Sequence, residues 1–427
     1  MSGARQAALD AVALLRRGTF SSEALDAAIS GAKLDRRDAA LCERIVRGTV
    51  QNLAYIDYVI GLWSKTPVKR LESRVLDILR ISVCQLLYLD RVPARAAVSE
   101  AVELCRVSGK ARAAGLVNGV LRRVSEHRDD IPEVPGRGSE AYLAVRYSHP
   151  EPLVHEFVAR RGYDGAEALL AANNAEPPIT IQTNTLKTTP EALLNAIQVL
   201  GVTIQPGICA GSYDLSGAGD VKALPGYDEG LFYVQDAAAR LAVEAAAPVR
   251  GMRVLDACSA PGGKSFAAAM LMQGEGLILA CDLKEKRLKR VDEGAKRLGI
   301  DMIETAVMDA RTPQEELRGA FDVVIADAPC SGLGVIRRKP EIRFKSASEI
   351  ESLPEIQLAI LKGLAGCVKP GGVLLYSTCT LLERENEGVV RAFMDGNREF
   401  TVTEERTLWP DTDKTDGFFI CRMVRSI

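Results

Sequence analysis

Residues 253–265 read Arg-Val-Leu-Asp-Ala-Cys-Ser-Ala-Pro-Gly-Gly-Lys-Ser, an apolar stretch that ends in an acid and enters a helical pattern through a glycine turn. Gly262 and Gly263 have no side chain, so the backbone can approach a ligand closely there. The helix that follows offers free N–H groups at its start. Because ligands bind outside the carboxyl ends of the strands in an open parallel sheet, this stretch predicts a binding site at such a strand end.

Strand and helix patterns alternate downstream of the glycine turn. Apolar strands are expected at 277–282, 321–327 and 372–377, with helical stretches between them. Continuous apolar strands separated by helices indicate a parallel sheet that is covered on both faces. We therefore predict that residues 246–427 form a Rossmann-like α/β domain.

The chain before this domain has two different patterns. Residues 140–245 mix strand-like pieces at 179–184 and 231–234 with short helices such as 193–200, which predicts a small α+β subdomain. A polar Pro- and Gly-containing linker at 127–139 precedes it. Residues 1–128 repeat apolar residues at helical spacing, and Asp35 is placed to cap a helix. This part is predicted to be a bundle of five to seven helices.

Charge and cysteine usage limit the possible functions. Residues 1–130 carry 21 Lys and Arg against 15 Asp and Glu, whereas the rest of the chain is acidic. A basic helical end hints at nucleic-acid contact, but a solvated helical surface explains it equally well. Ten cysteines without a C-x-x-C pair, and only three histidines, argue against a zinc site. With no signal peptide or membrane span in the sequence, we expect a monomeric cytoplasmic protein with mostly buried thiols.

The expected strand ends carry residues suited to a nucleoside. Asp282 follows the glycines by about twenty residues, where a carboxylate can bind ribose hydroxyls. Asp309 is placed to reach an adenine edge. A nucleoside site without a phosphate loop fits S-adenosylmethionine. The predicted cofactor-binding residues are Cys258, Ser259, Ala260, Pro261, Gly262, Gly263, Lys264, Asp282, Asp309 and Asp327.

Other interpretations of this region compete with that one. A phosphate-binding P-loop requires glycine where Cys258 stands, and the G-x-G-x-x-G pattern is also absent. Asp282 could merely cap a helix. Cys258 is expected to pack inertly while its backbone binds. For Lys264, contact with cofactor or base and a purely electrostatic role at the helix start both remain open.

Two strand ends carry a further constellation. One gives Asp327-Ala-Pro-Cys330-Ser-Gly, and the other gives Ser377-Thr-Cys379-Thr. Both fall at carboxyl ends of the expected sheet, so two thiols and a carboxylate should face one crevice. A lone cysteine at a strand end is usually a small core residue, but two of them beside a nucleoside site indicate chemistry.

These paired motifs resemble the RNA (cytosine-5) methyltransferase superfamily. The stretches 334–341 (Gly-Val-Ile-Arg-Arg-Lys-Pro-Glu), 147–150 (Tyr-Ser-His-Pro) and 416–419 (Asp-Gly-Phe-Phe) are similar to the RsmB (Sun) family of 16S rRNA methyltransferases. Residues 113–123 resemble the NusB-like RNA-binding domain fused to that family. The resemblance spans essentially the whole chain, and it implies a class I S-adenosylmethionine-dependent methyltransferase sheet behind a NusB-like helical domain.

The resemblance also implies a reaction and its residues. Cytosine C5 is too weak a nucleophile to take a methyl group directly, so a thiolate first adds to C6 and converts the ring into an enamine. The resemblance assigns this attack to Cys379. Asp327 would bind N3 and the exocyclic amine, and Cys330 would assist release of the product. The implied substrate is 16S rRNA or a small-subunit precursor, and the implied process is ribosome biogenesis.

RNA contacts and departures from the family pattern complete the prediction. Basic residues 337–339 could hold flanking phosphates, unless they form a solvated charge cluster. Further candidates in the helical region are Arg36, Arg37, Arg112, Arg122 and Arg123. The departures are Gln182 for the usual Arg, Phe344 for the usual Trp, and the absence of a common Pro in 383–386.

Two rival functions were considered. The first is cytosine-5 methylation of tRNA or of another rRNA position. The second is a non-catalytic RNA-binding or antitermination factor, against which the intact Cys330, Cys379, Asp327 and glycine turn argue.

Overall fold

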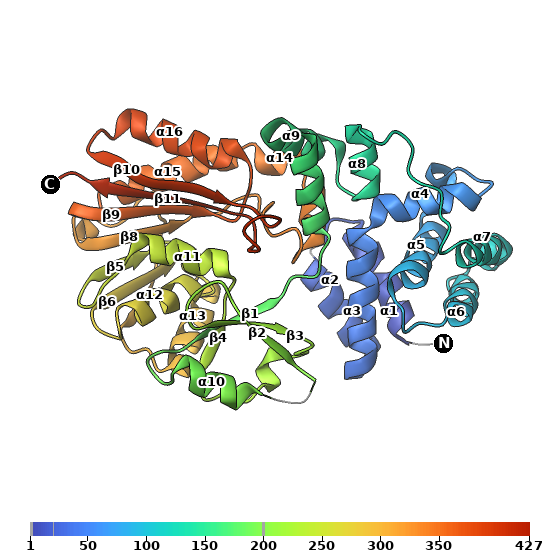
Figure 1. Ribbon diagram of the computed structural model, residues 1–427, viewed down its shortest axis with the longest axis horizontal. Coiled ribbons are helices and arrows are strands. Elements are labelled where there is room, and N and C mark those ends of the chain that lie inside the picture. Colours follow the sequence, from blue (N-terminus) through green and yellow to red (C-terminus); the bar gives the residue numbers. More distant parts are fainter. Residues whose placement is uncertain (1–2, 20, 199–200) are drawn as a thin grey trace. The chain divides into compact units, whose positions relative to one another are not determined.

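The computed structural model describes residues 3–19, 21–198 and 201–427 (Figure 1). The chain divides into two compact units. The first, called here the helical unit, comprises the chain up to Ala175 together with Ile336–Phe344. The second, the sheet unit, comprises Glu176–Val335 and Lys345–Ile427.

The helical unit consists, as described, of α-helices and short 3-10 turns. Its part within residues 1–128 was predicted as a helical bundle, whereas the helices at 140–146 and 151–173 lie in the region predicted as the small α+β subdomain. Its α-helices are α1 (Gly3–Leu15), α2 (Ser21–Ala32), α3 (Arg36–Gln51), α4 (Leu53–Trp63), α5 (Ser73–Tyr88), α6 (Ala94–Val107), α7 (Ala114–Glu126), α8 (Glu140–Arg146) and α9 (Glu151–Asn173). The 3-10 turns are η1 (Val68–Arg70), η2 (Ala111–Ala113) and η5 (Pro340–Phe344). Asp35 caps α3 by accepting a hydrogen bond from the Asp38 N–H, as expected.

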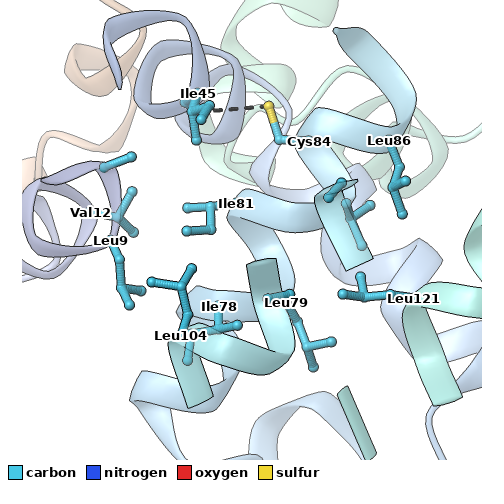
Figure 2. Packing of buried hydrophobic residues seen from close by; sticks show 14 of the residues in the cluster. Leu9, Val12, Ile45, Ile78, Leu79, Ile81, Cys84, Leu86, Leu104 and Leu121 are labelled. Atoms are coloured by element: carbon cyan, nitrogen blue, oxygen red, sulfur yellow. Dashed lines mark hydrogen bonds between the residues drawn. The ribbon is translucent and has the colours of Figure 1, made fainter. Parts of the chain in front are cut away.

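The core of the helical unit is built around α5, whose apolar residues recur on more than one side. Figure 2 shows Ile78, Leu79 and Ile81 of this helix among apolar side chains of its neighbours. Leu9 of α1, Ile45 of α3, Leu104 of α6 and Leu121 of α7 are all fully buried in the same cluster. A helix that is apolar nearly all round has to be surrounded by others, which explains its central place.

The stretch Ile336–Phe344 joins the helical unit although it lies deep in the second half of the sequence. Its anchor is Arg343, whose side chain is almost completely buried. The guanidinium donates to the carbonyl oxygens of Gln51 and Ser148 at 3.1 and 2.9 Å and to Asn174 Oδ1 at 3.0 Å. Arg47 of α3 donates to the Arg338 carbonyl at 2.9 Å. Periodicity gave no sign of this insertion.

The sheet unit begins with a small antiparallel sheet, in the region predicted as α+β. Its strand order is β2-β3-β1-β4. The elements are β1 (Ile179–Thr183), α10 (Pro190–Ile197), β2 (Thr203–Pro206), β3 (Ser212–Ser216), η3 (Val221–Ala223) and β4 (Phe232–Val234). The helix expected over 193–200 begins earlier and ends at Ile197, and residues 199 and 200 lie outside the described part of the chain.

The larger sheet has seven strands in the order β10-β11-β9-β8-β5-β6-β7. The strands are β5 (Arg253–Asp256), β6 (Leu277–Asp282), β7 (Ile303–Val307), β8 (Phe321–Asp327), β9 (Val368–Thr378), β10 (Phe400–Leu408) and β11 (Phe418–Arg425). The helices are α11 (Ala237–Ala246), α12 (Gly263–Leu271), α13 (Glu285–Leu298), α14 (Ala347–Ile350), α15 (Leu353–Ala365) and α16 (Glu387–Gly396), with η4 (Glu315–Leu317) and η6 (Glu383–Glu385).

Five neighbouring strands of this sheet, from β7 to β9, run parallel, which confirms the predicted Rossmann-like parallel sheet. Strand β11 departs from this pattern and pairs antiparallel with both β9 and β10. Residues 409–417 connect β10 to β11, and a connection of this length favours antiparallel pairing, because parallel neighbours need a longer crossover.

Both faces of the sheet are covered, as the continuous apolar strands indicated. Side chains such as Val254 and Leu375 pack with α11, α12 and α13, whereas their neighbours Leu255 and Leu374 pack with α15 and α16 (Figure 1). Successive strand residues point to opposite faces, so each apolar run supplies both cores.

Candidate active site

The parallel strands bring the predicted site residues to one edge of the sheet. Strand β8 lies between β5 and β9, and β6 lies on the far side of β5. Asp327 at the end of β8 is in register with Ser377 of β9, and Asp256 ends β5 beside Ile325. The loops that follow these strands therefore open at the same edge.

The glycine loop starts from a buried acid. Asp256 is fully buried, and its Oδ2 accepts a hydrogen bond from Ser265 Oγ at 2.7 Å. Among the described residues nothing hydrogen-bonds its Oδ1, nor the buried Oγ of Ser259 in the loop. Burial raises the pKa of Asp256 to about 6. Buried polar atoms without partners are costly, so this loop retains hydrogen-bonding capacity for a ligand or water.

Gly262 is required by its own backbone conformation. Its φ is +110°, a region that side chains other than hydrogen rarely tolerate, and an added Cβ would come within 2.5 Å of the Phe266 ring. The loop is also tied to the next strand, since the Ser259 N–H donates to the Cys281 carbonyl at 2.8 Å. Helix α12 starts directly after this turn, at Gly263.

Asp282 and Asp309 follow the next two strands. Asp282 is 3% exposed and accepts from the Lys284 N–H at 3.0 Å. The N-cap of α13 is Lys284, and among the described residues no side chain caps this helix, so the alternative that Asp282 merely caps a helix does not hold. Asp282 also accepts from Arg287, which in turn donates to the Ala260 carbonyl of the glycine loop at 3.1 Å. Asp309 is held instead by Arg311, and hydrogen bonds from that residue lower the pKa of the carboxyl.

Lys264 points to Asp327. Its Nζ lies 2.7 Å from Asp327 Oδ2, and Ser377 Oγ donates to the other carboxylate oxygen at 2.9 Å. Burial opposes the lysine's charge, but Asp327 and Asp256, together with Cys379, raise its pKa above the ordinary value. The ammonium also lies 5.1 Å from the centre of the Phe418 ring. The sequence left the role of Lys264 open, and the structure shows that this lysine forms an ion pair with Asp327.

The two cysteines of the paired motifs face each other. Cys330 Sγ and Cys379 Sγ are 3.2 Å apart, far beyond the roughly 2.05 Å of a disulfide. Both are partly exposed, as is Cys258, whereas the other cysteines are buried. The hydrogen bond to Cys379 and burial raise the pKa of Cys330 well above its ordinary value. The two sulfurs are thus close enough to share a proton, and either can be its donor.

The thiol of Cys258 fits the expectation of inert packing. Burial raises its pKa strongly, and nearby carboxylates, Asp327 foremost, raise it further. A thiol in such surroundings stays protonated and unreactive.

Two glycines let three motifs converge next to Cys379. Gly334 donates its N–H to the Cys379 carbonyl at 2.9 Å, and Gly417 donates to the Gly334 carbonyl at 2.8 Å. An added Cβ on Gly334 would lie 2.0 Å from the Gly417 oxygen, so no larger residue fits. The quoted motifs contained both glycines, but only the structure relates them to the cysteine.

Sequence reasoning missed several side chains that hold the cysteine loops. Lys345 Nζ donates to the Ser331 carbonyl at 2.7 Å. Gln357 of α15 donates to the Pro329 carbonyl at 3.0 Å. Glu385 and Asn386 also contact these loops. Gln357 lies on a helix with no motif, so nothing in the sequence marked it, whereas Glu385 and Asn386 follow Cys379 closely.

The basic residues predicted to contact RNA are found in different surroundings. Arg337 is buried, Arg338 is half-buried and Lys339 is exposed, and all three belong to the helical unit. The alternative of a solvated charge cluster is therefore wrong for Arg337. The other candidates in this unit have exposed side chains: Arg36, Arg37, Arg112, Arg122 and Arg123.

Two of the departures from the family pattern are also located. Gln182 is buried and donates to the Gln235 carbonyl at 3.2 Å, a contact made within the sheet unit. Phe344 is 44% exposed.

Within residues 3–19, 21–198 and 201–427, no group of three or more His, Cys, Asp or Glu side chains could hold a metal ion. Over the same ranges, no helix has the length and apolar character needed to cross a bilayer.

Comparison with family models gives three consecutive matches. Residues 243–424 match the model described as 16S rRNA methyltransferase RsmB/F. Residues 2–126 match the NusB family, and residues 149–221 match the ferredoxin-like domain described as RsmF/B-like.

Curated relatives and solved structures agree with these models. The probable ribosomal RNA small subunit methyltransferase B of Bacillus subtilis strain 168 is 34% identical over 98% of both chains. Ribosomal RNA small subunit methyltransferase B of Pseudomonas putida KT2440 is 35% identical over 92% of both. A methyltransferase homologue from Pyrococcus horikoshii superposes with a TM-score of 0.60 at 25% identity, covering 67% of this chain and 98% of its own. The chain therefore belongs to the RsmB/F family of ribosomal RNA small subunit methyltransferases.

Proposed function

We propose that this enzyme methylates C5 of a specific cytosine in 16S rRNA, using S-adenosylmethionine and a covalent bond between Cys379 and C6 of the base. The observation that carries this proposal is the cysteine pair. Two thiols 3.2 Å apart lie at the strand ends that also hold the buried Lys264–Asp327 ion pair. Such a cluster supplies a nucleophile, a proton donor and a fixed charge in one crevice.

The residues of the sheet unit fit S-adenosylmethionine, which supplies an electrophilic methyl group. The buried Ser259 Oγ and Asp256 Oδ1 offer hydrogen-bonding atoms at the glycine loop. Asp282, buried at the end of β6, would bind the ribose hydroxyls. Asp309 would reach the adenine, with the remaining loop residues 258–264 contacting the cofactor through their backbone.

Cys379 would start the reaction. Its sulfur adds to C6, and the ring electrons move so that C5 becomes an enamine carbon, which then takes the methyl group. Asp327 would bind N3 and the exocyclic amine of the base. The charge of Lys264 stabilises both the Asp327 carboxylate and negative charge on the Cys379 sulfur. As a carboxylate, Asp327 would accept from the exocyclic amine, and from N3 once that atom takes a proton from solvent in the adduct.

Cys330 would assist release. Before attack, its thiol donates to the Cys379 sulfur, which favours the thiolate form of the nucleophile. Once Cys379 is bonded to C6, that negative charge is gone, and Cys330 can lose its proton to solvent more easily. The freed Cys330 can then help remove the C5 proton. The electrons of the C5–H bond restore the ring, and the C6–S bond breaks.

The wider organisation follows from the same proposal. We infer a NusB-like RNA-binding domain at 1–128, a small α+β subdomain at 140–245 and a methyltransferase domain at 246–427. The exposed arginines of the first domain would contact 16S rRNA or its precursor. We further propose a monomeric enzyme that works in the cytoplasm, where ribosomal subunits are assembled.

Bisulfite sequencing of 16S rRNA tests the substrate and the nucleophile together. Cells that lack the protein should lose one 5-methylcytosine. The wild-type gene should restore it, and Cys379→Ala should not. Cys367→Ala, at a buried cysteine of the same sheet unit, serves as the matched control and should restore it. Methylation that persists without the protein would contradict the 16S assignment, and a lost tRNA methylation would favour the tRNA alternative.

A second variant tests the division of labour between the thiols. Cys330→Ala should accumulate a covalent complex with 16S rRNA, because attack proceeds while release is impaired. Denaturing gel electrophoresis separates that complex from free protein. The double variant Cys330→Ala/Cys379→Ala should give none. A Cys330→Ala enzyme that turns over normally without any adduct would overturn the assigned roles.

A further inference from the structure

Glu385 is a fully buried carboxylate next to the cysteine pair that the proposed reaction does not use. It ends the short turn η6, six residues after Cys379, and Asn386 follows it directly. Asn386 is also fully buried. Burying a charge costs free energy unless hydrogen bonds compensate for it. The hydrogen bonds of Glu385 and Asn386 therefore indicate what these two residues do.

Glu385 holds the chain on both sides of Cys330. Its Oε2 accepts from the Ser331 N–H at 2.9 Å and from Gln357 Nε2 at 2.9 Å. The same Gln357 nitrogen donates to the Pro329 carbonyl at 3.0 Å. The peptide groups before and after Cys330 are thereby fixed by one buried carboxylate and its amide partner.

Asn386 holds the residues on both sides of Cys379. Its Oδ1 accepts from Thr378 Oγ1 at 2.6 Å, and its Nδ2 donates to the Thr380 carbonyl at 3.0 Å. One side chain thus spans the nucleophile loop. Ser331 Oγ and Thr380 Oγ1, the hydroxyls that follow the two cysteines, are hydrogen-bonded at 2.6 Å and close the arrangement.

The charge of Glu385 also acts on Cys330. Its second oxygen, Oε1, is buried and has no hydrogen-bond partner among the described residues, so its charge is little screened. The groups that face Cys330 are Cys379 and Tyr376 from β9, Asp327 from β8, Glu385 from η6 and, at the Ser331 carbonyl, Lys345. Lys264 is paired with Asp327. Glu385 is one of the negative groups that raise the pKa of Cys330, after Cys379 and burial.

We propose that Glu385 and Asn386 are positioning residues that hold the two cysteine loops against each other, and that the charge of Glu385 keeps the shared proton on Cys330 so that Cys379 is the nucleophile. The division of roles between the thiols rests on the proposed function. The location of the proton does not, because it is a property of the enzyme alone. Either cysteine could otherwise lose its proton first, since both are partly exposed and adjacent.

The test measures alkylation of Cys330 by iodoacetamide against pH, in the full chain, with mass spectrometry to separate the two cysteines. Glu385→Gln keeps an oxygen for both hydrogen bonds and removes only the charge. The Cys330 profile should move to lower pH by about 1–2 units, because one nearby negative charge is lost. Glu383→Gln, an exposed carboxylate of the same turn, is the matched control and should leave the profile in place.

Two further variants separate charge from geometry. Glu385→Asp retains the charge on a shorter side chain, so its Cys330 profile should stay close to that of the wild type even if Glu385→Gln fails to fold. Asn386→Ala should slow covalent complex formation with 16S rRNA by about tenfold or more, because the nucleophile loop loses its hold. Its Cys330 profile should be unchanged.

The outcomes distinguish this inference from the proposed function. A folded Glu385→Gln enzyme with the wild-type Cys330 profile overturns the role of the charge. So does a Glu385→Asp enzyme whose profile shifts as far as that of Glu385→Gln. Normal complex formation by Asn386→Ala overturns the role in positioning. If wild-type enzyme forms no complex with 16S rRNA while the alkylation profiles behave as expected, the proposed function fails and the proton assignment stands.

Discussion

At the scale of single residues, two aspartates of the large sheet, one at the site and one near the opposite strand ends, have pKa values shifted in opposite directions. Asp256 is buried with one hydrogen bond to Ser265, and its pKa is raised to about 6. Asp322, in the same sheet unit, is different. Burial raises its pKa, but hydrogen bonds from the Arg253 N–H and Lys369 outweigh this and lower it. As pH rises, the contribution of Asp256 to the free energy of unfolding should therefore fall, whereas that of Asp322 should rise.

Asp256→Asn should stabilise the sheet unit at neutral pH. An aspartate titrates near 3.9 when unfolded and near 6 here, so folding becomes less favourable as pH rises between these values. Above pH 6 the full penalty, about 3 kcal/mol, is present. The substitution should recover part of it at pH 7.5 and almost none near pH 4. Hydrogen exchange of β5 amides measures the local free energy of opening.

The matched substitution Asp322→Asn should have the opposite effect. Its carboxylate stabilises the fold above the unfolded pKa, and this contribution is lost as pH falls through the lower folded pKa. Asp322→Asn should therefore destabilise the unit at pH 7.5. A stabilised Asp322→Asn, or an Asp256→Asn that is equally destabilised at both pH values, would contradict these assignments.

At the scale of elements, η5 is the least expected part of the structure. Five residues, Pro340–Phe344, carry an arginine whose guanidinium is bonded almost entirely to carbonyl oxygens of α3 and of the turn before α9. Burial lowers the pKa of Arg343 to about 9. The guanidinium donates several hydrogen bonds to neutral backbone carbonyls. These carbonyls lie at the end of α3 and in the turn before α9, and they would otherwise be buried without a donor.

Arg343→Met should destabilise the helical unit by about 3–5 kcal/mol, since the substitution leaves several buried carbonyls without a donor. Calorimetry should show a lowered transition for this unit. Arg91→Met, at an exposed arginine of the same unit, should change its midpoint by no more than a degree or two. Equal midpoints for the two variants would mean that the backbone carbonyls bonded to Arg343 find other hydrogen-bond donors.

The elements also show what a sequence can predict. The strands at 277–282 and 321–327 agree with β6 and β8 to the residue, because uninterrupted apolar runs that end in an acid have few alternatives. Strand β10 was not anticipated, since its sequence, Phe-Thr-Val-Thr-Glu-Glu-Arg-Thr-Leu, is polar and half-exposed at the sheet edge.

The site divides along the same line. Cys330, Cys379 and Asp327 were predictable from motifs at strand ends, and the structure brings the two thiols together. Gln357 and Lys345 were not, because each bonds to a backbone group that lies more than ten residues away in sequence, Lys345 to Ser331 and Gln357 to Pro329. Hydrogen bonds from side chain to distant backbone leave no periodicity or spacing in the chain.

At the scale of the whole molecule, charge is unevenly divided along the chain. Residues 1–130 have a net charge of +6, while the chain as a whole has −2. Nucleic-acid binding that depends on phosphate contacts weakens with salt in proportion to the number of contacts. The proposed RNA-binding role of the helical unit is therefore measurable as a salt dependence.

Arg122→Gln/Arg123→Gln should reduce the slope of log Kd against log salt by about 1–2 for 16S rRNA, because up to two phosphate contacts are lost. Arg398→Gln, an exposed arginine of the sheet unit, is the control and should leave the slope unchanged. Filter binding between 50 and 200 mM salt, taken as roughly the useful range, gives both slopes. An unaltered slope in the double variant would exclude these arginines from the footprint.

The return of residues 336–344 to the helical unit has a consequence for synthesis. A ribosome releases α1–α9 first, and N-terminal parts usually fold as they emerge. Yet this unit cannot be finished until the whole of Glu176–Val335, with its glycine loop and Cys330, has been made. The contacts of Arg343 with Gln51 and Ser148 close loops of nearly two hundred residues or more, which is slow. Nascent chains should thus carry a helical unit whose helices are assembled but which lacks the Arg343 contacts, and these contacts should form only after the Cys330 loop has been made.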